Sequence, residues 1–184
     1  MTDDGRQPTL NDGLTYRDTL VAALHKHGVC YLVPTPQGDE PEVSDADLIV
    51  GLASGKDARL RFSLSALLIR QPRLGALAVD LARHSTHPTV KAEIEKQYLA
   101  AMYLQRIWHW RLMRKFGAFE LLPEVFVPEY GLTDSSVNCG EIGLWELSQR
   151  SRFNDWDTWE GVVDLLCECP CESAENIREA LLYV

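Results

Sequence analysis

The residues most able to do chemistry in this chain lie in the segment 105–116, QRIWHWRLMRKF. On a helix, Arg106 and His109 share one face because they are three residues apart. An imidazole can act as a general acid or base, and a guanidinium can stabilise an oxyanion or phosphate. The pair can equally form a satisfied network in a core, with Arg106 meeting a carboxylate from another helix. The core network is the preferred interpretation, since R-x-x-H occurs often by chance.

Cations follow this pair in a stretch from residue 97 to 119 that contains no acidic residue. Arg111, Arg114 and Lys115, interleaved with aromatic residues, could bind nucleic acid through phosphate contacts and stacking. They could also complement the dipole at a helix C-terminus, or hold an acidic segment of the same chain against the helix. The two structural interpretations are favoured over nucleic-acid binding.

The third candidate is the run CECPCE, which places Cys167, Cys169 and Cys171 at two-residue intervals. Zinc sites typically pair C-x₂-C with a second ligand pair, whereas this spacing is C-x-C-x-C. We therefore predict no metal and no cofactor, with a metal or thiol sensor using these three cysteines as the alternative. The irregular cysteine spacing predicts reduced thiols throughout the chain.

The 184-residue chain has a net charge of -9, and this charge is distributed unevenly along the sequence. Residues 1–119 hold 15 Lys and Arg against 13 Asp and Glu, whereas residues 120–184 hold 3 against 14. This acidic third argues against nucleic acid as a ligand and favours docking to a basic protein surface. The predicted partner-binding residues are Trp156, Trp159, Asp155, Asp157 and Glu160. Tryptophan is enriched among interface hot spots, and the polar sequence NDWDTWEG predicts partial exposure. Trp145, within GLWEL, is expected in the core.

The elements that must position these residues are almost all helical. Helices are predicted over 9–28, from Ser44 capped with Asp47, from Ser54 capped with Asp57, and from Pro72 onward. One long helix of about 88–116 follows, then shorter helices over 141–150, 158–168 and 173–183. VCYLV at 29–33 resembles a strand, and a proline-rich loop covers 34–41. The pattern predicts an all-α bundle of seven or eight helices around the long one.

Length and composition predict one compact domain overall. Within it, residues 1–43 form an N-terminal helix with the proline-rich loop, and residues 44–184 form the bundle. No stretch has the ~20 apolar residues that span a bilayer, so no membrane association is expected. The polar, acidic N-terminus is unlike a signal peptide, which favours a cytoplasmic location.

Three stretches resemble a group of all-helical bacterial proteins encoded beside small nucleotidyltransferases. They are KDARLRFSLSALLIRQPRLG, YLAAMYLQRIWHWRL and LLPEVFVPEYGL, and the likeness covers about residues 45–165 through its hydrophobic framework. The resemblance implies a context like two-gene toxin–antitoxin modules, which pair such an enzyme with a helical HEPN-type ribonuclease. Those nucleases separate arginine and histidine by four to six residues. Here two residues separate Arg106 from His109, and three separate Arg83 from His87, so no catalytic residue is carried over.

These observations together favour a non-enzymatic accessory or regulatory subunit that binds another protein through an acidic C-terminal surface. The first alternative is a helical enzyme acting on RNA or a phosphorylated ligand, with His109 and Arg106 as its catalytic groups. A solvent-open cleft containing His109 would favour this alternative, whereas a fully buried, hydrogen-bonded His109 would argue against it.

Overall fold

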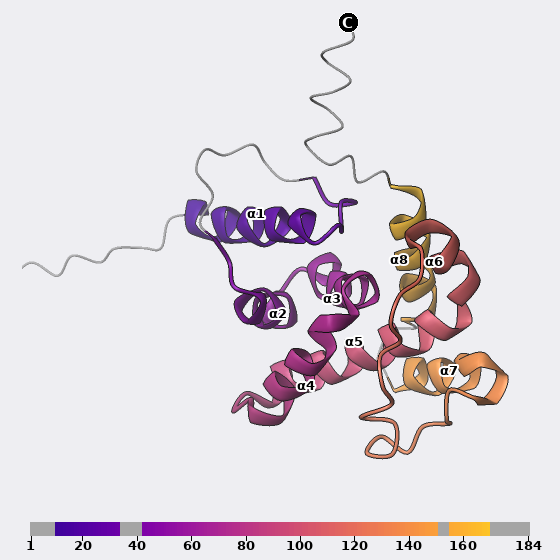
Figure 1. Ribbon diagram of the computed structural model, residues 1–184. Coiled ribbons are helices and arrows are strands. Elements are labelled where there is room, and N and C mark those ends of the chain that lie inside the picture. The colour runs from indigo at the N-terminus through magenta and orange to yellow at the C-terminus, as the bar shows by residue number, and fades with distance from the viewer. Residues whose placement is uncertain (1–9, 34–41, 151–154, 170–184) are drawn as a thin grey trace, which may run out of the picture.

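The computed structural model describes residues 10–33, 42–150 and 155–169. This part contains eight α-helices and no strand, which confirms the predicted all-α class (Figure 1). The helices are α1 (Leu10–Lys26), α2 (Asp45–Ser54), α3 (Ala58–Arg70), α4 (Gly75–His84), α5 (Pro88–Ile107), α6 (His109–Phe116), α7 (Glu141–Gln149) and α8 (Trp156–Glu168). Two short 3₁₀ helices, η1 (Pro72–Leu74) and η2 (Val137–Gly140), precede α4 and α7.

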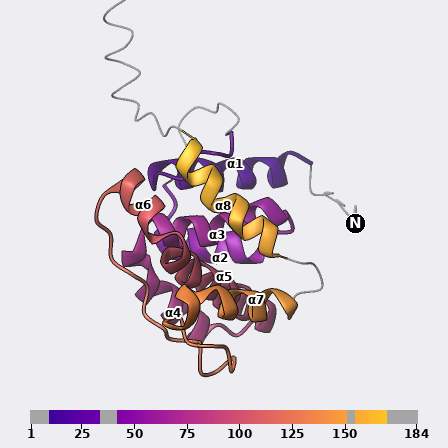
Figure 2. The same ribbon diagram turned by 90° about the vertical axis from the view of Figure 1, so that its right-hand side faces the viewer.

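Helix α5 is the centre of the bundle. Every residue from 97 to 105 is buried, so this helix is surrounded on all sides. Helices α2, α3, α4 and α7 pack around it, and α5 is seen nearly end-on among them in Figure 2. The prediction of an all-α bundle around the segment beginning at Pro88 is confirmed.

The predicted long helix of 88–116 is two helices, because the backbone turns at Trp108. This residue has φ −103° and ψ 23°, outside the α-helical range. The hydrogen bonds still run through the bend, since the Trp108 N–H donates to Leu104 and the Leu112 N–H donates to the Trp108 carbonyl, each at 2.9 Å. The indole of Trp108 packs against the core, while α6 departs from the axis of α5. The sequence contains no proline or glycine here that would have signalled the bend.

Helix starts follow the predicted capping chemistry at one position and depart from it at another. The Ser44 hydroxyl accepts from the Asp47 N–H at 3.1 Å and caps α2, as predicted. Ser54, predicted to cap the next helix, is the last residue of α2. Asp57 is the cap of α3 instead, with its carboxylate accepting from the Arg59 N–H at 2.9 Å.

The strand predicted at 29–33 is wrong, because these residues are irregular, with bends at 31 and 32, and follow the turn at 27–28 that ends α1. No second strand lies alongside in the described chain, so an extended run there would have no partner for its backbone hydrogen bonds. The proline-rich loop at 34–41 and the helix predicted at 173–183 lie outside the described residues.

Candidate functional site

Arg106 lies near the end of α5 and fastens the chain that follows α6. Its guanidinium donates to the carbonyl of Met102 at 2.8 Å and to that of Leu122 at 3.0 Å. Its Nε lies 3.8 Å from Glu124 Oε1. Burial lowers the pKa of the guanidinium, and the Glu124 carboxylate opposes this effect. The neighbouring Gln105 accepts from the Leu122 N–H at 2.8 Å, so two consecutive side chains hold one residue of the loop.

His109 is the first residue of α6 and is only partly buried. Its ring lies 5.4 Å from the ring of Phe119 and 5.7 Å from that of Trp110. Its Nδ1 is buried and has no hydrogen-bond partner among the described residues. The imidazole is therefore not part of a hydrogen-bonded core network, which was the preferred expectation. Arg106 belongs to such a network, although its carboxylate partner comes from a loop and not from another helix.

Both side chains line an open concavity of about 540 Å³, which we name the α6 concavity. Its lining residues are Arg106, Ile107, His109, Trp110, Leu121, Ser135, Ser136 and Cys139. Helices α5 and α6 form one side of it, and the loop before α7 forms the other. Arg106 and His109 were selected from the sequence. Ser135, Ser136 and Cys139 join them only because the chain before α7 packs near α5 and α6, and no sequence pattern indicates this contact.

The loop side of the concavity has an unusual backbone. Asn138 and Cys139 have φ of 48° and 53°, and Gly140 follows at 92°. Left-handed conformations of non-glycine residues cost about 1–3 kcal/mol and cluster at functional sites. Cys139 is exposed and its thiol is free. Nearby, the Ser135 hydroxyl donates to the Glu124 carboxylate, which connects the loop to Arg106.

Trp110 forms the exposed rim of the concavity. Its side chain is 77% exposed, and Leu121, which also lines the concavity, is 40% exposed. Sequence reasoning did not select either residue. The helical spacing offers a signal for Trp110, because it lies four residues before the exposed Arg114 and therefore on the same solvent side of α6.

The three predicted basic residues have different surroundings. Arg111 pairs with Asp164 and lies 3.6 Å from Glu168, both on α8. Figure 1 shows α6 and α8 next to each other. Arg111 thus holds an acidic helix of the same chain, one of the two structural roles expected. Arg114 and Lys115 are exposed on α6.

The predicted partner-binding residues are divided between surface and core. Trp159 is fully buried and its Nε1 donates to Gln97 Oε1 at 3.1 Å, so the expected partial exposure is wrong. Asp155 is 5% exposed and lies 3.5 Å from Lys96 Nζ. Trp156, Asp157 and Glu160 remain at least partly accessible.

Trp145 shows the opposite error. It was expected in the core, but its side chain is 57% exposed. Its neighbours Leu144 and Leu147 occupy the buried face of α7, which turns residue 145 toward solvent.

The cysteine candidates do not converge on a site in the described chain. Burial raises the pKa of the Cys167 thiol in spite of the nearby Arg111, so this thiol resists forming the thiolate that metals and oxidants require. Among the described residues, no three His, Cys, Asp or Glu side chains are grouped as metal ligands. Cys171 lies outside these residues. Cys30 is disulfide-bonded, so the expectation of reduced thiols throughout is wrong there.

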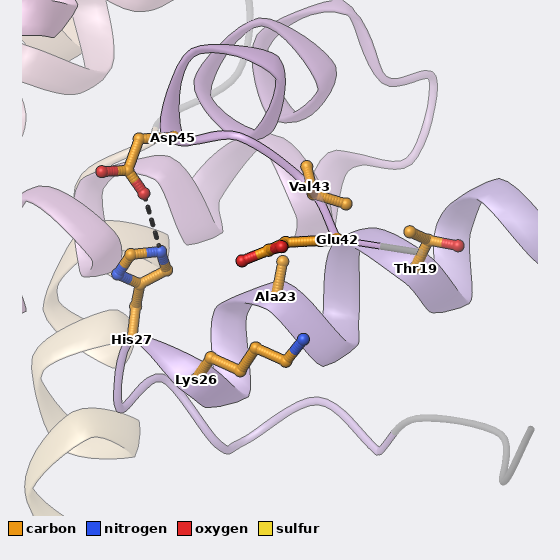
Figure 3. A pocket seen from close by; sticks show the side chains of 7 residues that line it. All are labelled: Thr19, Ala23, Lys26, His27, Glu42, Val43 and Asp45. Atoms are coloured by element: carbon orange, nitrogen blue, oxygen red, sulfur yellow. Dashed lines mark ion pairs between the residues drawn. The ribbon is translucent and has the colours of Figure 1, made fainter. Parts of the chain in front are cut away.

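A second, polar pocket lies beside the C-terminal end of α1 (Figure 3). His27 Nε2 and Asp45 Oδ1 are 3.1 Å apart across it, and Lys26 and Glu42 also line it. Its volume of about 220 Å³ is below the range typical of small-molecule sites. We assign it no binding role.

Comparison with known proteins identifies no similar protein, so the proposed function rests on the geometry of the site. The scan against protein-family models and the searches of curated proteins and solved structures return no match. None of the described helices combines the length and apolarity needed to cross a bilayer.

Proposed function

We propose that this protein is a non-enzymatic binding subunit that holds a protein partner at the α6 concavity. The observation that carries the proposal is Trp110, a large aromatic side chain 77% exposed at the rim of an open hollow. Exposed apolar groups around a concavity mark interaction sites, and tryptophan is the residue most enriched among hot spots. Leu121 adds a second exposed apolar side chain to the lining, while Arg106 and His109 supply polar groups.

The proposal keeps a protein partner and moves its anchor from α8 to α6. Asp155 and Asp164 are engaged by Lys96 and Arg111 of the same chain, which leaves less free charge on α8 for a basic partner. Asp157 and Glu160 can still contribute to docking at the margin. The net charge of -9 argues against nucleic acid.

The resemblance noted in the sequence makes a small nucleotidyltransferase the first partner to test. A cytoplasmic location belongs to this proposal, although a disulfide at Cys30 is more typical of oxidising compartments.

Replacing Trp110 with alanine is expected to weaken partner binding by about 30-fold or more, the effect of losing a ~2 kcal/mol hot spot. The partner is first identified by tagged co-purification from the native host, and its Kd is then measured by titration calorimetry. Trp145→Ala is the matched control, because it removes an equally large exposed side chain from another helix. Equal Kd values for wild type and Trp110→Ala would contradict the proposal, as would an equal loss in both variants.

An enzymatic function is the second candidate, favoured by His109, which lines an open concavity together with Arg106 and has no hydrogen-bond partner at its buried Nδ1 among the described residues. In this function His109 is the acid or base, and Arg106 stabilises an anion. The donors that Arg106 already commits to the Met102 and Leu122 carbonyls count against it.

The enzymatic candidate predicts that wild-type protein cleaves RNA or a phosphoester and that His109→Asn lowers the rate by about 10²-fold or more. The rate is measured with end-labelled RNA, and Trp110→Ala serves as the control because it leaves the imidazole in place. Absence of cleavage by the wild type, or full activity of His109→Asn, would exclude this function.

A further inference from the structure

An apolar groove runs between α3 and α8, away from the α6 concavity. Its volume is about 550 Å³. Tyr31, Phe62, Val162 and Leu165 are among the side chains that line it, and Leu165 is 42% exposed. Groove floors of this kind accept an amphipathic helix, whose apolar face fills them.

Two features suit this groove to binding a helix. The Phe62 ring meets the buried Trp159 ring edge-on at 6.2 Å, which fixes the wall supplied by α3. At Gly161 of α8, an added Cβ would meet no atom of the described residues within 4 Å. Glycine inside a helix costs about 0.5–1 kcal/mol relative to alanine, and here it leaves the backbone open to close approach by another element.

We propose that residues 173–184 of the same chain cover this groove as an amphipathic helix folded back along α8. These residues lie outside the described part of the chain, and the proposal rests on their sequence and on where α8 ends. At 100° per residue, Ala174, Ile177, Ala180, Leu181 and Val184 share one face. Glu172, Glu175 and Glu179 fall on the opposite face, which would point to solvent.

The connection is long enough for this return. The groove-lining residues of α8 run from Thr158 to Leu165, about 10 Å at 1.5 Å per residue. The described chain ends at Cys169, one turn past Leu165, and Pro170 follows. Residues 170–173 can reach about 13 Å when extended, enough for a turn between antiparallel helices. A tether this short gives the segment a high effective concentration at the groove.

The test is nuclear Overhauser contacts in the full-length chain between the Leu181 methyl groups and the Phe62 ring. We expect these contacts in the wild type, their loss in Leu181→Asp, and at least about tenfold faster amide exchange at the α8 residues of the groove in that variant. Leu182→Asp is the matched control, because residue 182 lies off the apolar face. It should leave both contacts and exchange unchanged.

Three results would overturn the proposal. Absence of Leu181–Phe62 contacts in the wild type would show that the segment lies elsewhere. Equal effects of Leu181→Asp and Leu182→Asp would show that no single face docks. A separate protein whose binding is abolished by Leu165→Asp and unaffected by Leu181→Asp would show that the groove serves that protein instead.

Discussion

Trp159→Ala should lower the free energy of unfolding by about 3–5 kcal/mol. The side chain is fully buried between α3 and α5, where it meets the Phe62 ring and hydrogen-bonds Gln97. Its removal leaves a cavity and also leaves the buried Gln97 carbonyl oxygen without its donor, which adds to the cost. Urea unfolding followed by circular dichroism measures the change.

The control for this substitution is Trp145→Ala, which removes the same side chain from an exposed position and should change stability by less than about 0.5 kcal/mol. A second comparison separates packing from hydrogen bonding. Trp159→Phe should be partly rescued by adding Gln97→Leu, since the second change removes the orphaned carbonyl oxygen, at the cost of the hydrogen bond that Gln97 Nε2 donates to Glu93. A loss below about 1 kcal/mol for Trp159→Ala would contradict the buried position.

Gly143→Ala should destabilise the protein by about 2–3 kcal/mol, although alanine is the better helix former. A Cβ at Gly143 of α7 would lie 2.3 Å from Cζ of Tyr103 on α5. The tyrosine cannot move aside easily, because it is fully buried and its hydroxyl donates to the Thr133 carbonyl at 2.7 Å. Thermal and urea unfolding of the purified variant give the effect.

A double-mutant cycle identifies the clash as the cause. Tyr103→Leu alone loses packing and a hydrogen bond, but it removes the ring that a methyl group at position 143 would strike. The loss in the double variant should therefore be smaller than the sum of the two single losses. Additive losses, or a Gly143→Ala variant as stable as the wild type, would show that α7 can withdraw from α5.

Local signals explain which parts of the fold could be predicted. Ser44, Pro88 and Gly117 mark helix ends through the chemistry of a few neighbouring residues, and the structure places helix boundaries at all three. The bend at Trp108 has no such local signal, because it depends on how the indole packs against the core.

The candidate site shows the same limit. The spacing of Arg106 and His109 indicated that they lie together, and they line one concavity. Exposure of the tryptophans was predicted from neighbouring polarity, which failed for both Trp145 and Trp159. The face that a helix buries is decided by close fits such as Gly143 against Tyr103, and these join residues far apart in the sequence.

Hydrogen bonds between two side chains of α5 and the backbone of Leu122 divide the long connection between α6 and α7 into two loops. Each loop is anchored to the bundle separately. Gln105 and Arg106 hold the amide and the carbonyl of this one residue, and its side chain is 1% exposed. On the other side, Arg111 fastens α6 to α8. A protease cut between residues 117 and 120 would thus leave each new end anchored to the bundle. The two pieces should stay together as a nicked, folded protein. For the same reason, we expect the fold to tolerate an inserted sequence between residues 117 and 120.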